Sequence, residues 1–150
     1  SQVTSMHSMF ARCSSLTSLD LSSFNTSNVT SMGWVFSWCP ALVTLDLSSF
    51  NTSQVTYMEG MFYECSSLIS LNISNFDTSN VTSMGRMFFG CKKIQTEIHI
   101  MNAGLDDYET MLANALTDAN SYIILGYTAD TQAIATALKG NNPKIILKAI

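Results

Sequence analysis

Two hydrophobic periodicities alternate along the first hundred residues and divide them into short elements. Met6, Met9, Phe10 and Cys13 have the i, i+3, i+4, i+7 spacing of one face of a helix. Leu19-Asp20-Leu21 then alternates apolar and polar residues, as a half-buried strand does. The short polar side chains of Asn25-Thr26-Ser27-Asn28 favour a tight bend. The pattern therefore predicts a short helix, a short strand and a turn.

This arrangement repeats with a constant step of 26 residues. The step is kept by the cysteines at 13, 39, 65 and 91, and by in-phase valines, threonines, methionines and phenylalanines. A coil of this size cannot bury its apolar face alone, so neighbouring coils must stack. We expect residues 1–100 to form about four units of an α/β solenoid. Its strands should make one parallel sheet, with the short helices on the opposite side.

Residues 101–150 have a different composition and are predicted to cap the stack. Twenty of the 21 serines lie in residues 1–100, whereas nine of the 11 alanines lie in residues 101–150. The apolar spacing after Asp106 and Asp107 predicts a helix through Leu116, because acidic residues favour the first turn of a helix. A strand (122–125), a helix capped by Asp130 and a strand (144–148) should follow. This αβαβ cap would extend the parallel sheet by two strands.

The step of 26 residues is broken near the end of the fourth unit. The two apolar residues expected at 97 and 99 stand at Ile98 and Ile100 instead. We interpret this shift as one extra residue within Thr96–Ile100 that changes the register of the sheet.

The repeated motif is similar to that of a known family. Asn28-Val-Thr-Ser-Met and its copies at Gln54 and Asn80, each followed by a Phe and a Cys, resemble BspA-like leucine-rich-repeat surface proteins of bacteria. The tail from Asn102-Ala-Gly-Leu is similar to the segment that often closes such arrays. The resemblance covers essentially the whole chain and implies a right-handed, leucine-rich-repeat-like solenoid. It also implies a secreted or cell-surface adhesion module that binds a protein or glycan, without a cofactor or an enzymatic activity.

The resemblance names no ligand, and self-association is possible. The alternative from another class is a structural spacer that carries a separate functional domain. Residues 1–150 contain no secretion signal and no surface anchor, and Ser1 aligns with Ser27 within a unit. We therefore expect an N-terminally truncated fragment.

Composition and charge exclude several other classes of function. Charged residues make up 12% of the chain and its net charge is −4, so no basic surface is expected for nucleic acid. No apolar run approaches the roughly 18 to 20 residues of a membrane helix, so membrane insertion is not expected. His7 and His99 should lie at opposite ends of the stack, and no phosphate-binding glycine loop is present. These features argue against catalysis.

The four cysteines suggest a metal site, but the stacking argues against it. Coils about 4.8 Å apart would spread four cysteines over roughly 14 Å, which is too far for one zinc ion with bonds of about 2.3 Å. We expect buried free thiols that pack as small apolar side chains.

Two polar columns are further candidates. Asp20, Asp46 and Asn72 should point outward from adjacent strands, where they could hold calcium or bind a sugar, or could bond only to each other and to solvent. Threonines at 4/30/56/82 and 26/52/78 could form an ice-binding array, although turn formation explains them better.

Trp34 and Trp38 depart most from the repeat. Both should lie on the outer flank of the second unit's helix, at positions that are small or charged in the other units. They could anchor a partner. Alternatively, Trp34 could lie over Gly60 of the next coil and Trp38 could stack under Arg12. The sequence leaves both interpretations open.

Overall fold

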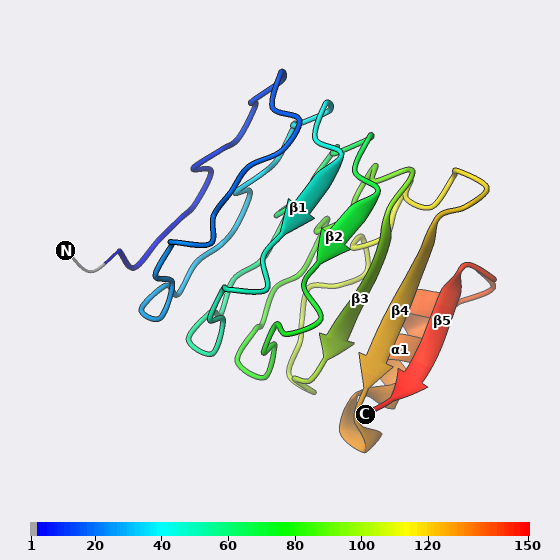
Figure 1. Cartoon of the computed structure of the whole chain (residues 1–150). Helices are drawn as coiled ribbons and strands as arrows, with labels where there is room; N and C mark the ends of the chain where they lie inside the picture. The colour runs from blue at the N-terminus through cyan, green and yellow to red at the C-terminus, as the bar shows by residue number, and fades with distance from the viewer. Residues whose placement is uncertain (1–2) are drawn as a thin grey trace.

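Five parallel strands form one sheet along one side of the molecule (Figure 1). The computed structural model describes residues 3–150. The strands are β1 (Thr44–Asp46), β2 (Ser70–Asn72), β3 (Gln95–Ile100), β4 (Tyr122–Tyr127) and β5 (Ile145–Ala149), and their order in the sheet follows the chain. The short helix η1 (Ala129–Thr131) and helix α1 (Gln132–Lys139) connect β4 to β5. The predicted α/β class with a single parallel sheet is confirmed.

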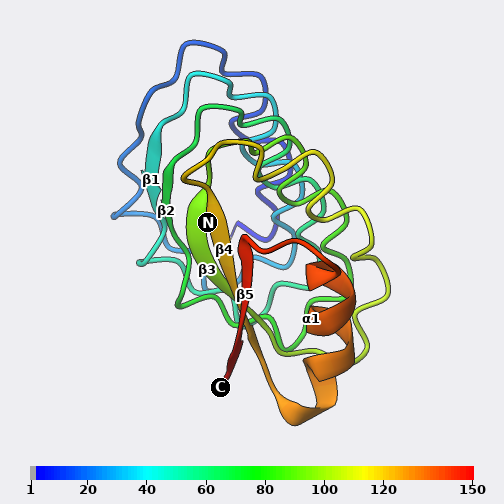
Figure 2. The ribbon, with the colours of Figure 1, turned by 90° about the vertical axis from the view of Figure 1, so that its right-hand side faces the viewer.

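The core lies between this sheet and the opposite side of each coil. Figure 2 shows the coils stacked one behind another, with the strands on one side and the turns on the other. In β1 and β2 the central leucines, Leu45 and Leu71, are buried and their neighbours are exposed. On the far side the rings of Phe36, Phe62 and Phe88 stack with centroids 5.8 and 5.6 Å apart. The 26-residue period thus places like residues in contact, and their burial supplies the main stabilisation.

The prediction of short helices opposite the sheet is wrong. Residues 6–12, 32–38, 58–64 and 84–90, here called the turn segments, contain turns and no helix. Their alternate amides bond to the next unit: the Phe36 N–H donates to the Met61 carbonyl at 2.9 Å, and the Trp38 N–H donates to the Tyr63 carbonyl at 2.7 Å. A helix would use these amides internally. The apolar spacing predicts one buried face, which the second, third and fourth units have and the first unit has only at Met6. Neighbouring coils, not a helix, satisfy the backbone of these segments.

The tail continues this pattern before it departs from it. Residues 108–114, predicted as a helix, form turns like those of the other units, and the Phe88 N–H donates to the Met111 carbonyl at 2.9 Å. The αβαβ cap therefore contains only one α-helix. Its strand–helix–strand part is present as predicted, but Asp130 does not cap α1. Asp130 lies inside η1, where the Thr131 hydroxyl accepts a hydrogen bond from the Thr128 N–H at 2.9 Å.

The register changes where the sequence indicated, but in the opposite sense. Ser70 pairs with Gln95, a step of 25 residues, so the unit is one residue shorter rather than one longer. The buried positions of β3 are consequently Thr96, Ile98 and Ile100. The Thr96 hydroxyl compensates for its polarity by donating to the Leu71 carbonyl at 2.9 Å.

The two ends of the stack differ. In the first unit Met9 is 45% exposed, whereas the equivalent Met61 is fully buried, because no earlier coil in the described chain covers it. At the other end α1 packs against β4 and β5. Within residues 3–150, no helix combines the length and the apolar character needed to cross a bilayer.

Candidate interaction surfaces

Four aromatic side chains gather on the side of the molecule that carries the turn segments. We call Trp34, Trp38, Tyr63 and Phe89 the aromatic cluster. The Tyr63 ring lies 5.4 Å from Trp34 and 5.7 Å from Trp38, between centroids, and stacks on Phe89 at 5.0 Å. The two tryptophans therefore flank a tyrosine of the following unit, which holds them in place.

Trp34 is partly buried by its own neighbours. Gly60, the equivalent residue of the next unit, lies directly against the Trp34 ring, and a Cβ added there would overlap it. This is the intramolecular packing that one of the two sequence interpretations described. Trp34 is therefore half-buried, with one part of its ring covered by Gly60.

Trp38 is different, because its side chain is 49% exposed. Together with Arg12, Ser14 and Pro40 it lines an open hollow of about 440 Å³. Its backbone is left-handed, with φ 57°, a conformation that is unfavourable for a bulky residue. Gly90 holds the equivalent position two units later with φ 72°. Within the described residues, Arg12 forms no ion pair, so its charge is available to a ligand in the hollow.

Tyr63 and Phe89 were not among the predicted site residues. Their signal was present, because the column Ala11, Ser37, Tyr63 and Phe89 changes from small to aromatic along the repeat. A comparison of each outward column across all units would have found the complete cluster.

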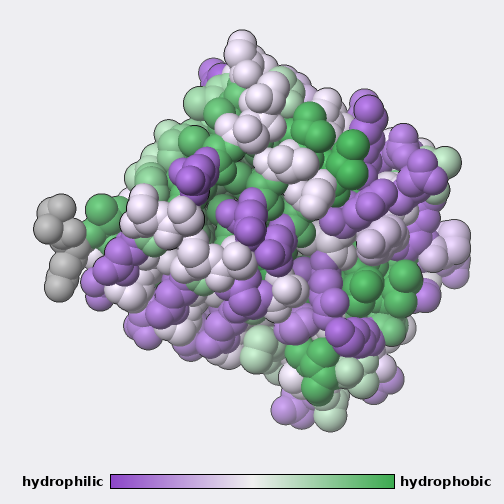
Figure 3. All heavy atoms as spheres, in the orientation of Figure 1, coloured by the Kyte–Doolittle hydropathy of each residue, from purple (hydrophilic) through white to green (hydrophobic). Residues whose placement is uncertain are grey.

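The polar column lies on the outer face of the sheet, because the residues on either side of the buried leucines in β1 and β2 are exposed. On this side of the molecule hydrophilic and apolar atoms are interspersed (Figure 3). Asp46 and Asn72 bond to each other, with Asn72 Nδ2 donating to Asp46 Oδ1 at 3.0 Å. Asp20 lies one coil away, and the Ser22 N–H donates to its carboxylate at 3.0 Å. Hydrogen bonds from Ser22 and Ser48, respectively, lower the pKa of Asp20 and of Asp46.

These bonds go to one carboxylate oxygen, Oδ1, of Asp20 and of Asp46, and both residues remain exposed. Across residues 3–150, no group of three or more His, Cys, Asp or Glu side chains is placed to hold a metal ion.

The threonine columns also bond within the protein. The hydroxyls of Thr26, Thr52 and Thr78 are buried and donate to backbone carbonyls of the next unit at 3.0, 3.1 and 2.6 Å. The outer column donates to the preceding unit, as Thr56 does to the Thr30 carbonyl at 3.3 Å. Both columns therefore connect successive coils.

All four cysteines are free, and three of them are buried. The exception is Cys13, which is exposed at the uncovered first coil, so the expectation of burial is wrong there. Cys65 Sγ donates to the Phe36 carbonyl at 3.1 Å, and burial raises its pKa to about 12. Burial raises the pKa of Cys39 and Cys91 as well, so these thiols stay protonated.

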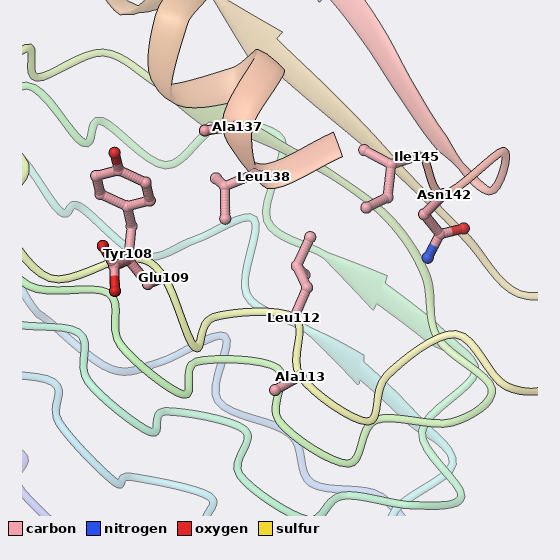
Figure 4. Close-up of a pocket in the computed structure, with 8 residues that line it drawn as sticks. All are labelled: Tyr108, Glu109, Leu112, Ala113, Ala137, Leu138, Asn142 and Ile145. Carbon is pink, nitrogen blue, oxygen red and sulfur yellow. The ribbon is translucent and has the colours of Figure 1, made fainter. Parts of the chain in front are cut away.

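A second hollow, of about 370 Å³, lies between α1 and the last turns (Figure 4). Leu112, Leu138 and Ile145 point into it, and Glu109 is the one acid among its lining residues. The hollow offers apolar contact and contains no histidine, cysteine or second carboxylate to work with Glu109 as an acid–base pair.

Comparison with known families gives a match over most of the chain. Residues 1–101, and again residues 36–122, match the family described as "Mycoplasma protein of unknown function, DUF285". The chain belongs to this family. The two overlapping DUF285 matches are consistent with the 26-residue repeat, since one unit can align with another. Comparison with curated proteins and with solved structures gave no match.

Proposed function

We propose that this chain is a non-catalytic interaction module of a bacterial cell surface, which binds a protein or glycan through the exposed face of Trp38. The proposal includes the finer architecture, a right-handed leucine-rich-repeat-like solenoid of the BspA-like type. The stacking of equivalent residues between units supports that architecture. The resemblance of the repeat motif supports an extracellular or surface location.

The exposed face of Trp38 carries the functional part of the proposal. An indole that is half exposed at a left-handed position adds little to folding, since glycine serves at the same position in another unit. Partner binding would bury this ring, and tryptophan is among the residues that contribute most to binding at interfaces. Arg12 and Ser14 add donors beside the ring, which suits a carboxylate or hydroxyl group of a ligand.

The substitution Trp38→Gly tests this assignment. Removal of the Cβ relieves the strain of the left-handed backbone conformation. Loss of the contact with Tyr63 costs about 0.5 to 1.5 kcal/mol. These effects oppose each other, so the free energy of unfolding should change by no more than about 1 kcal/mol. Binding to matrix proteins and glycans, screened with the wild-type chain and measured again with the variant, should fall at least tenfold if Trp38 is a hot spot.

Glu64→Gly is the matched control, because Glu64 holds the equivalent position of the next unit with φ 56°. It makes the same backbone change without removing the indole, and should bind as the wild type does. If Trp38→Gly binds every identified partner with wild-type affinity, the assignment to Trp38 is wrong. A chain that binds none of the proteins or glycans tested would favour the spacer alternative.

A further inference from the structure

The outer edge of β5 is an open strand edge. β5 pairs with β4 on one side and packs against α1, and no other described strand pairs with it. Figure 2 looks toward this end of the molecule, where β5 lies in front of β4. Proline, an exposed charge such as that of lysine, a bulge or a covering loop commonly protects such an edge. The β5 sequence Ile145–Ala149 contains no proline and pairs with β4 in unbroken register.

The hydrogen bonds to β4 show which residues face outward. The Lys144 carbonyl accepts from the Ile123 N–H, and the Ile150 N–H donates to the Tyr127 carbonyl, both at 3.0 Å. Because alternate residues of a parallel strand bond to the same neighbour, the even-numbered residues of β5 face β4. The backbone groups of Ile145, Leu147 and Ala149 consequently face away from the sheet.

This outward pattern is complementary to itself. In an antiparallel pair centred on Leu147, the two Leu147 residues face each other and Ile145 faces Ala149 of the second copy. Each of these is a hydrogen-bonded pair, since the N–H and C=O groups of one residue point the same way. The Ile145 N–H already donates to the Asn142 carbonyl, which leaves four bonds across the axis, from Leu147 and Ala149 of each copy.

The side chains on the solvent side of β5 fit the same arrangement. Ile146 and Ile150 are 48% and 49% exposed, so apolar surface remains to be covered. Lys148 carries the one charge on β5. Its Nζ lies 2.8 Å from Oε1 of Glu97 on β3, and this ion pair neutralises the charge. Lys148, and then His99, lower the pKa of Glu97 and keep it ionised. In the pairing centred on Leu147, each Ile146 would face Lys148 of the second copy, not another Ile146.

We propose that β5 pairs antiparallel with β5 of a second copy of this chain, with the Leu147 residues opposite each other, to form a two-fold dimer in which the two sheets become continuous. Among the described residues that precede β1, no strand is assigned that would offer a comparable edge. A two-fold axis uses the same patch on both subunits, so the assembly closes at two chains.

Two opposite charges at one exposed position test the pairing by sedimentation equilibrium. Ile146→Glu places a carboxylate opposite Lys148 of the second copy, and should tighten the dimer about 3- to 10-fold. Ile146→Lys places like charges opposite each other, and should weaken it by a similar factor. Both variants remove the same isoleucine, so loss of apolar area alone would shift the two dissociation constants in the same direction.

A backbone test complements the charge pair. Ala149→Pro removes an outward N–H that β4 does not use, so it should give a folded monomer. Its melting temperature should match that of the wild-type chain diluted below its dimer dissociation constant, because the dimer itself adds stability at higher concentration. Ala149→Val retains the N–H and should remain dimeric. A wild-type chain that is monomeric at every concentration, or Ile146→Glu and Ile146→Lys dissociation constants that do not separate, would overturn the proposal. Dimers that survive Ala149→Pro would also overturn it, and would indicate contact through the exposed first coil.

Discussion

Left-handed backbone positions decide what the outward residues of the turn segments can do. Trp34, Gly60 and Arg86 hold one such position in successive units, and Trp38, Glu64 and Gly90 hold the other. A side chain there costs about 1 kcal/mol relative to glycine, so each one present needs compensating contacts or a role in binding. Trp34 has such contacts with Gly60 and Tyr63, whereas Trp38 leaves half of its side chain in solvent.

Gly60→Ala tests the packing of Trp34. The added Cβ would overlap the indole and would adopt φ 59°, so the free energy of unfolding should fall by about 2 kcal/mol or more. Urea unfolding of the purified variant measures the change.

Gly90→Ala is the control for backbone strain alone. Its Cβ would lie 2.7 Å from the Glu64 carboxyl, the end of a flexible side chain that can move away. The free energy of unfolding of Gly90→Ala should therefore fall by only about 1 kcal/mol. Equal losses for the two variants would show that Trp34 adapts freely, and would contradict the packing described for it.

The cysteines should differ in reactivity by position. Cys13 is exposed and should react with a thiol reagent at pH 9 in the native protein, whereas Cys39, Cys65 and Cys91 should react only after unfolding. The denatured chain should show four reactive thiols. Rapid native labelling of two or more thiols would contradict the burial of the inner column.

The raised pKa of Cys65 also predicts a direction for stability with pH. Its pKa is about 12 in the folded chain and 9.0 as the ordinary value, so the folded state holds this proton more tightly. The contribution of the Cys65 thiol to the free energy of unfolding is complete below about pH 9 and is lost as the pH rises toward 12. Cys65→Ser, which does not titrate there, should flatten this part of the stability profile.

At the scale of elements, hydrophobic spacing identified the buried face of each turn segment but not its backbone. A spacing of i, i+3, i+4, i+7 is typical of a helix, yet two left-handed residues per segment interrupt any helix there. Residues 108–114, where a helix was also expected, form turns as well, and Asn114 is left-handed with φ 56°. By contrast, the amides of α1 donate hydrogen bonds within the helix itself. Gly140 lies just beyond the end of this helix.

At the scale of the whole molecule, the tail should be necessary for the repeats to stay soluble. Deletion of residues 101–150 removes β4, which pairs with all six residues of β3, and uncovers the apolar side of Phe88. We expect the 1–100 fragment to aggregate during size-exclusion chromatography, because an open strand edge and an exposed core face both promote association.

The fragment 27–150 provides the comparison. It lacks the first unit but retains the complete C-terminal end, and it exposes one coil face much as the whole chain does at Met9. It should stay folded with a moderate loss of stability. A monomeric, cooperatively folding 1–100 fragment would instead show that the tail is a separate domain.

The strict 26-residue period was sufficient to predict the repeat, the inward residues and the order of the strands, because equivalent residues in adjacent coils must face the same interior. The sequence also indicated β4, α1 and β5, because their apolar runs and Gly140 lie close together in the chain. The predicted cap, Asp130, was wrong. Trp38 was selected for the same local reason, since its departure from the repeat is visible without a structure.

The hydrogen-bond partners of the backbone and the contacts of the exposed residues became clear only from the three-dimensional arrangement of the coils. Inter-coil hydrogen bonds replaced the predicted helices, and the pairing of Ser70 with Gln95 reversed the predicted register change. The placement of Tyr63 between two tryptophans depends on residues at least 25 positions earlier in the chain. The outward direction of the Leu147 backbone groups depends on how β5 pairs with β4. Local pattern carries no information about such partners, because contacts between coils form only when the stack is complete.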